Sequence, residues 1–126
     1  MIPYEVIFLV DDDPINNLIN KRLLVKLGIK AQILEFQEGI EAISLLEKSD
    51  PKKSTLIFLD INMPIMNGWE FLSVYQEKFP HRNDEIIILS SSIDYQDRLK
   101  AQEYKVVSGY LEKPLTMDKI TSQLIR

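Results

Sequence analysis

The chain has 126 residues, a formal net charge of −4, 45% hydrophobic residues and no cysteine. This length predicts a single domain, residues 1–126, that buries a core without disulfides or a structural metal. A mildly acidic chain with scattered lysines lacks the basic face that nucleic-acid binding requires. No apolar run reaches the roughly 20 residues of a membrane span, and the chain does not open on a leader-like segment. We therefore expect a cytoplasmic protein that contacts neither nucleic acid nor membrane.

The first expected elements are a strand at 6–10 and a helix that begins at Pro14. The run VIFLV is short, continuous and apolar, as in a strand buried on both faces. Pro14 suits the first turn of a helix because it has no N–H to lose there, and Gly28 supplies the stop. Between them, apolar residues recur at the spacing of one helix face: Ile15, Leu18, Ile19, Leu23 and Leu27.

The rest of the chain repeats this alternation. Short apolar runs predict strands, periodic patterns predict helices, and Pro- or Gly-containing segments separate them. The expected strands are 31–36, 55–59, 85–89 and 110–112, and the expected helices are 39–47, 68–78, 94–103 and 116–125. Strict alternation with apolar strands favours an α/β class, with a five-stranded parallel sheet that is doubly wound, so that helices cover both faces.

Polar residues follow four of these strands at the point where each strand ends. In a parallel sheet these ends lie at one edge, where ligands bind. The edge collects Asp11, Asp12 and Asp13, then Asp60, then Ser90 and Ser91, and finally Lys113. Carboxylates gathered without a cation repel one another. Mg²⁺ removes this repulsion, since it takes oxygen ligands and is commonly held by one or two carboxylates together with a phosphoryl oxygen; Mn²⁺ could substitute for it.

Asp60 is the residue on which this chemistry centres. A carboxylate at the end of a buried strand is costly to desolvate, and beside a cation it can act as a nucleophile. Phosphoryl transfer needs charge stabilisation, for which Lys113 offers a cation and Ser90 a hydroxyl donor. Each part alone has a plainer explanation: the triple Asp could cap the next helix, and Ser-rich or Lys-Pro segments are common turns. Their joint position at one sheet edge favours the functional interpretation.

Four motifs, in this order and spacing, make the chain resemble the receiver domain of two-component response regulators, of the chemotaxis-regulator type. They are FLVDDDP, LDINMPIMNG, IIILSSS and GYLEKPL, and the resemblance extends from Val6 to the last helix. It implies a single receiver domain with a flavodoxin-like (βα)5 fold and the strand order 2-1-3-4-5.

The resemblance also implies roles for individual residues. Asp60 matches the phospho-acceptor. Asp11 and Asp12 match the acidic pair that binds Mg²⁺ together with Asp60, and Asn62 matches the position whose backbone carbonyl completes the protein's share of the metal ligands. Asp13 is expected to lie outside this metal site.

Further matches concern the phosphoryl group and the switch. Ser90 matches the hydroxyl residue that bonds the phosphoryl group, and Lys113 matches the lysine that pairs with it, next to a cis peptide bond at Pro114. Tyr110 matches the aromatic residue that turns inward as Ser90 moves. Asn62 and Ser92 occupy positions that tune how fast the phosphoaspartate hydrolyses.

The implied function is that of a phosphorylation-controlled signalling switch in a two-component phosphorelay. A histidine kinase or a histidine phosphotransfer protein donates the phosphoryl group to Asp60. The face formed by the fourth helix, fifth strand and fifth helix then changes to control binding of a downstream protein. An alternative is a relay intermediate that passes the group on. We expect a stand-alone receiver that phosphorylates and dephosphorylates itself but has no dedicated turnover substrate, and so is not an enzyme in that sense.

Two other classes use a similar sheet edge. A phosphatase of the haloacid dehalogenase type also has a strand-end aspartate and Mg²⁺, but its second aspartate lies two residues later, where this chain has Asn62. A flavodoxin-like cofactor-binding module needs a phosphate cradle of Gly, Ser and Thr after the first strand, where this chain has three carboxylates that would repel an anion.

Overall fold

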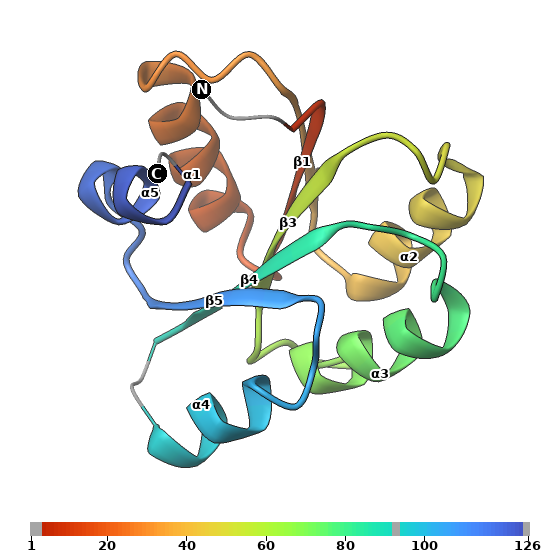
Figure 1. Ribbon diagram of the computed structural model, residues 1–126. Coiled ribbons are helices and arrows are strands. Elements are labelled where there is room, and N and C mark those ends of the chain that lie inside the picture. Colours follow the sequence, from red (N-terminus) through yellow and green to blue (C-terminus); the bar gives the residue numbers. More distant parts are fainter. Residues whose placement is uncertain (1–3, 92–93, 125–126) are drawn as a thin grey trace.

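Strands and helices alternate along the whole described chain (Figure 1). The structure is a computed structural model that describes residues 4–91 and 94–124. Its elements are β1 (Val6–Val10), α1 (Pro14–Lys26), β2 (Gln32–Phe36), α2 (Gly39–Lys48), β3 (Thr55–Asp60), α3 (Gly68–Lys78), β4 (Glu85–Ser90), α4 (Tyr95–Ala101), β5 (Val107–Glu112) and α5 (Met117–Leu124). The α/β alternation expected from the sequence is therefore confirmed.

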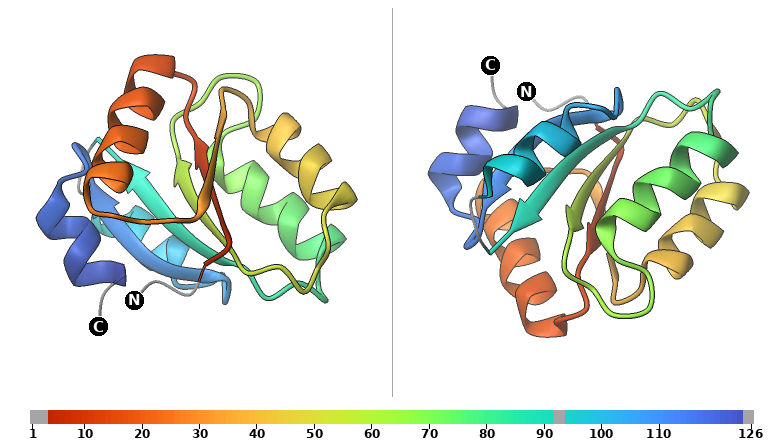
Figure 2. Two further views of the ribbon diagram at one scale, coloured as in Figure 1. Left: turned by 90° about the horizontal axis from the view of Figure 1, so that it is seen from above. Right: turned by 90° about the horizontal axis from the view of Figure 1, so that it is seen from below.

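The five strands form one parallel sheet in the order β2-β1-β3-β4-β5. Helices α1 and α5 cover one face of the sheet, and α2, α3 and α4 cover the other (Figures 1 and 2). This is the doubly wound, flavodoxin-like arrangement with the strand order 2-1-3-4-5 that the sequence and its resemblance predict. In this topology the carboxyl ends of neighbouring strands open onto one edge, where ligands bind.

The alternation of side chains along each strand divides the core in two. In β1, Phe8 belongs to the cluster that packs under α2, α3 and α4, whereas Ile7 belongs to the cluster under α1 and α5. In β3, Ile57 and Phe58 divide in the same way. Every residue of β1 and β3 is buried, which explains their continuous apolar sequences. None of the helices within the described ranges is long and apolar enough to cross a membrane.

Helix α1 forms as expected, but only the second half of its expected apolar face packs against the core, where Leu23 and Leu27 contact the cluster under α1 and α5. Ile15, Leu18 and Ile19 are exposed, whereas Asn17, Asn20 and Leu24 are buried. The physical reason is that Asn17 hydrogen-bonds into the sheet edge: its Nδ2 donates to the carbonyls of Asp11 and Phe36. The first half of α1 therefore presents apolar side chains to solvent.

The last strand is longer than its apolar pattern indicated. It begins at Val107, whereas the sequence suggested 110–112. The additional residues, Val-Ser-Gly, have only one large apolar side chain, and it is their pairing with β4, through an irregular register at Ile86/Ile87, that makes them a strand. Of the final helix expected at 116–125, residue 125 lies outside the described residues.

Candidate functional site

Side chains from three different strand ends form one ion-paired group, in which Lys113 contacts two aspartates. Lys113, directly after β5, places its Nζ 2.9 Å from Asp11 Oδ2 and 3.3 Å from Asp60 Oδ1. Asp11 follows β1, and Asp60 is the last residue of β3. The three side chains expected at a single sheet edge are thus in direct contact.

Both carboxylates of this group are buried. The exposed fractions of Asp11 and Asp60 are 3% and 4%, whereas Asp12 is exposed. Burying a charged group is costly unless a partner compensates for it, and here the ammonium group of Lys113 is that partner. Asp12 therefore lies at the mouth of the site, and Asp60 at its base.

The electrostatics of the site depend on the balance between burial and pairing. Burial raises the pKa of Asp60 to about 6 from 3.8, an effect that the nearby Lys113 charge opposes and the Asp11 charge reinforces. For Lys113, burial lowers the pKa, but the hydrogen bond to Asp11 and the charges of Asp60 and Asp11 outweigh burial, so that the net pKa is raised. A neighbouring cation would therefore favour the ionised form of Asp60.

An acidic group at this edge has the composition of a hard-cation site. One carboxylate oxygen from each of Asp11, Asp12 and Asp60 lies within 4.8 Å of the others, and this is the one such group found among the described residues. Its donors are all oxygens, which suits Mg²⁺ better than zinc or copper. The residues present therefore fit the metal that the sequence implied.

Asp13 has a different role, as expected. Its side chain accepts a hydrogen bond from the backbone N–H of Ile15 at 2.9 Å and so caps α1. Its own backbone N–H donates to Asp11 Oδ1 at 2.9 Å and helps to fix that carboxylate. The helix-cap explanation of the triple aspartate thus applies to its third residue.

The loop between β3 and α3 is held tightly over Asp60. The backbone N–H of Asn62 donates to Asp60 Oδ1 at 3.2 Å, and that of Gly68 donates to the Ile61 carbonyl at 2.9 Å. A Cβ at Gly68 would lie 2.8 Å from the Ile61 Cα and 2.9 Å from the Asp60 carbonyl oxygen, so no side chain fits there. Ile65 has a φ of 68° in this loop, a left-handed conformation that is unusual for a β-branched residue.

The ends of β4 and β5 supply the remaining predicted residues. Ser90 is 1% exposed, and its carbonyl accepts a hydrogen bond of 2.7 Å from the Lys113 backbone N–H. The Lys113–Pro114 peptide bond is cis. Tyr110 has a buried hydroxyl that finds no hydrogen-bond partner among the described residues, and the Arg98 guanidinium lies 5.4 Å from its ring centroid. Ser92 lies outside the described residues.

Sequence reasoning missed Asn17. The side chain is 1% exposed and ties α1 to the ends of β1 and β2, with hydrogen bonds of 3.0 Å to the Asp11 carbonyl and 3.2 Å to the Phe36 carbonyl. The sequence pattern that could have revealed it is the helical spacing of Asn17, Asn20 and Leu24, the buried residues of α1. The apolar pattern of the neighbouring positions is stronger and was followed instead.

Comparisons with known proteins agree on one family. A family model described as the response regulator receiver domain matches residues 7–125. Among curated proteins, the chain is 32% identical over 118 residues to the nitrate/nitrite response regulator protein NarL of Escherichia coli (strain K12), covering 94% of this chain and 52% of that protein. It is 28% identical over 121 residues to the sensor histidine kinase CheAY of Helicobacter pylori, covering 96% of this chain and 15% of that protein.

A solved structure resembles the chain over nearly its whole length. The two-component response regulator from Cytophaga hutchinsonii superposes with a TM-score of 0.85 at 32% identity, covering 94% of this chain and 92% of that one. The curated relatives, by contrast, are longer: the chain spans about half of one and about a seventh of the other.

Proposed function

This chain belongs to the response regulator receiver domain family, and on that premise we propose that it is a phosphorylation-controlled switch whose acceptor is Asp60. The observation that carries the proposal is the contact of Lys113 with both Asp11 and Asp60. It gathers at one point a nucleophilic carboxylate, a second acid and a cation. Family membership places the protein in two-component signalling.

The proposed reaction is transfer from a phosphohistidine of a histidine kinase or a histidine phosphotransfer protein. A carboxylate oxygen of Asp60 attacks phosphorus, a P–O bond forms, and the P–N bond to the donor imidazole breaks. The imidazole nitrogen keeps the electron pair of the broken bond and takes up a proton from solvent. Since the pKa of Asp60 is raised only to about 6, the carboxylate is largely ionised at neutral pH and can act as the nucleophile.

Charge on the transferred group is balanced by residues already in place. The ammonium group of Lys113 lies 3.3 Å from Asp60 Oδ1, close enough to pair with a phosphoryl oxygen there. Ser90, at the end of β4, would donate its hydroxyl to a second oxygen. Asp11, Asp12, Asp60 and the Asn62 carbonyl would hold Mg²⁺, which supplies charge stabilisation when it is bound.

Phosphorylation would bias an equilibrium between two arrangements of the α4–β5–α5 face. The new dianion contacts Ser90 and Lys113 in only one arrangement, so it stabilises that arrangement. The Tyr110 hydroxyl supports this proposal, because it is buried without a hydrogen-bond partner in residues 4–91 and 94–124, and a ring position that gave it one would be favoured. A downstream protein would bind the changed face. We assign the protein no turnover substrate beyond its own phosphorylation and dephosphorylation.

The surroundings of Asp60 suit a protein donor. Ile15 and Ile19 of α1 are 64% and 50% exposed, and Ile65 of the β3–α3 loop is 85% exposed. Ile15 and Ile19 lie in the first turns of α1, which follows β1, and Ile65 lies in the loop that follows β3. Exposed apolar side chains on segments that follow the strands of the site gain free energy when a partner covers them.

The proposal is tested by incubating the chain with Mg²⁺ and acetyl phosphate and following its intact mass. Wild type is expected to gain the mass of one phosphoryl group, and the gain should disappear when EDTA removes Mg²⁺. Asp60→Asn should gain nothing, whereas Asp50→Asn, which removes an exposed aspartate in the loop before β3, at the opposite end of that strand from Asp60, should behave as wild type. Labelling of Asp60→Asn, or no labelling of wild type, would overturn the proposal.

A further inference from the structure

Lys119, in the first turn of α5, binds the turn that carries Lys113. Its Nζ donates to the carbonyl of Glu112 at 2.7 Å and to the carbonyl of Pro114 at 3.0 Å. These two residues lie immediately before and after Lys113 in the chain. A single ammonium group therefore spans the turn that presents Lys113 to the acceptor site.

The position of Lys119 is unfavourable for the helix itself. Its backbone N–H donates to Thr116 Oγ1 at 3.2 Å, so Thr116 caps α5, and Lys119 is the third residue of the helix. That position commonly carries Glu or Gln, which complete the cap, and a positive charge in a first turn opposes the helix dipole. Lys119 also forms no ion pair within residues 4–91 and 94–124. A residue that departs from the local pattern in this way points to a role outside its own helix.

The bonds of Lys119 act on backbone that is already held from the other side. The Glu112 carbonyl, which accepts from Lys119, belongs to the peptide unit whose N–H is that of Lys113. This N–H donates to the Ser90 carbonyl, at the end of β4, at 2.7 Å. Two residues after Lys113, Leu115 is 5% exposed and belongs to the core cluster under α1 and α5. Lys113 therefore extends from a turn that is anchored on both sides.

An anchored turn matters because of the contacts at the other end of the Lys113 side chain. This side chain is 20% exposed, and its Nζ lies 2.9 Å from Asp11 Oδ2 and 3.3 Å from Asp60 Oδ1. A lysine carries its charge on a flexible four-carbon chain, so a fixed backbone narrows the positions that the ammonium group can reach. Displacing a charge-stabilising group by about 1 Å can slow a reaction by roughly 100-fold. The orientation of the turn thus bears directly on the contact with Asp60.

We propose that Lys119 is a positioning residue for Lys113: by binding both carbonyls of the turn, it keeps the Lys113 ammonium group in contact with the two buried carboxylates. Its part in phosphoryl transfer rests on the proposed function, in which Lys113 pairs with an oxygen of the transferred group. No ion pair in the described part of the chain joins Lys119 to either carboxylate, so it acts through Lys113.

The first test reads the position of Lys113 directly, by NMR of the full-length chain labelled with ¹³C-lysine. The ε-methylene signal of Lys113 is assigned by its loss in Lys113→Met. In Lys119→Met this signal is expected to move, and Lys119→Arg, which keeps N–H donors for both carbonyls, should bring it back towards its wild-type position. The control Lys78→Met removes an exposed ammonium group at the end of α3 and should leave the signal unchanged.

The second test measures the rate of phosphoryl gain from acetyl phosphate at saturating Mg²⁺. Lys119→Met should lower this rate by about tenfold, because it loosens the turn without removing Lys113. Lys119→Arg should recover most of the rate, and Lys78→Met should match wild type. In the Lys113→Met background there is no ammonium group left to position, so adding Lys119→Met should change the remaining rate by less than about twofold.

The outcomes separate positioning from a contribution to stability alone. An unmoved Lys113 signal in Lys119→Met would overturn the proposal, and so would a loss of rate that persists undiminished in the Lys113→Met background. Urea unfolding that shows a loss of stability in Lys119→Met, with the Lys113 signal and the rate unchanged, would reduce Lys119 to a contact of the fold. If wild type gains no phosphoryl group, the proposed function fails, and the Lys113 signal still decides whether Lys119 holds that residue.

Discussion

At the scale of single residues, the site is a compromise between burial and charge. Asp60 is 4% exposed, and burial raises its pKa to about 6 although Lys113 stands 3.3 Å away. One lysine shared by two buried carboxylates does not fully compensate both. The free protein therefore holds Asp60 at a cost, which a bound cation would relieve.

This cost predicts a pH dependence of stability in metal-free buffer. The folded-state pKa of Asp60 is about 6 and its ordinary value is 3.8, so between these values the folded state binds more protons than the unfolded state. The protonated carboxyl of Asp60 thus contributes stability to the folded state at low pH. This contribution amounts to roughly 3 kcal/mol in total and is lost as pH rises through about 6.

Asp60→Asn should not show this loss of stability with rising pH, because its side-chain amide is neutral at every pH in the range. Its stability relative to wild type should increase steadily from about pH 4 to pH 7, by roughly 1 to 3 kcal/mol. Urea unfolding in EDTA buffer at several pH values measures this difference, with Asp50→Asn as the control. If the wild-type and Asp60→Asn curves ran parallel across this range, Asp60 would not have a raised pKa.

At the scale of elements, the sequence predicted the strand ends well and the helix faces less well. The ends of β1, β3, β4 and β5 could be located because each apolar run stops at a polar residue. Which strands are neighbours does not follow from the residues alone, and the order came from the resemblance. In β5, Val107–Glu112 is a strand because of its pairing with β4 rather than because of its own composition.

Helix α1 shows why the apolar pattern was misleading. Asn17 is buried because the carbonyls of Asp11 and Phe36 need its amide, and this contact turns Ile15 and Ile19 outward. Periodicity reports which residues share a face but not which face meets the sheet. The same reason hid the structural role of Asn17.

The exposed first half of the expected α1 face predicts different costs for two apolar substitutions. Leu24 is fully buried against the sheet, so Leu24→Ala should lower the free energy of unfolding by about 2 to 5 kcal/mol. Ile19 is 50% exposed, so Ile19→Ser should change it by less than about 1 kcal/mol. Chemical denaturation measures both. A larger loss for Ile19→Ser than for Leu24→Ala would contradict the orientation of α1.

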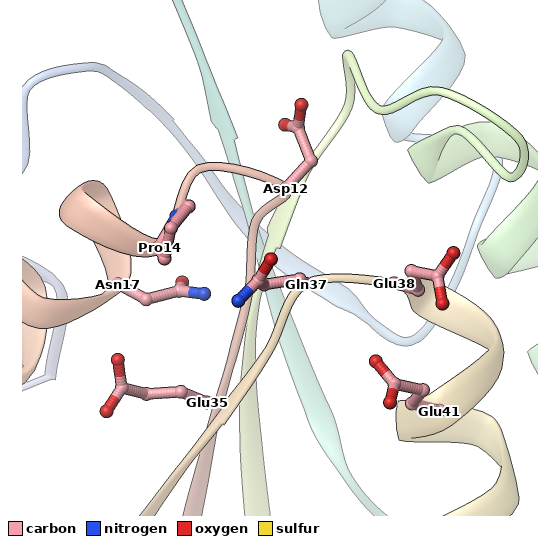
Figure 3. Close-up of a pocket in the computed structure, with 7 residues that line it drawn as sticks. All are labelled: Asp12, Pro14, Asn17, Glu35, Gln37, Glu38 and Glu41. Atoms are coloured by element: carbon pink, nitrogen blue, oxygen red, sulfur yellow. The ribbon is translucent and has the colours of Figure 1, made fainter.

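At the scale of the whole molecule, two neighbouring groups of carboxylates lie at the carboxyl edge of the sheet. One is Asp11, Asp12 and Asp60, and the other lines a pocket with Asp12, Glu35, Glu38 and Glu41 (Figure 3). The sheet supplies a rigid base, since β1 and β3 are buried throughout. The carboxylate that we propose as the acceptor therefore lies on stable strands, and loops and helix ends surround it.

A metal bound at this edge should stabilise the entire fold by mass action. At Mg²⁺ concentrations about 100 times the dissociation constant, the gain is about 2.7 kcal/mol, which corresponds to a rise of several degrees in melting temperature. Asp11→Asn/Asp12→Asn should lose this rise, whereas Glu77→Gln/Glu103→Gln should keep it. Calorimetry with and without Mg²⁺ provides the measurement, and an unchanged wild-type melting temperature at saturating Mg²⁺ would contradict the metal site.

The central claim is that Asp60 itself carries the phosphoryl group. After incubation with Mg²⁺ and acetyl phosphate, reduction with borohydride cleaves an aspartyl phosphate and converts that residue to homoserine, which peptide mass spectrometry can locate. Homoserine is expected at position 60, dependent on Mg²⁺, and at no other aspartate. Homoserine at another position, or none at position 60 in a phosphorylated sample, would contradict it.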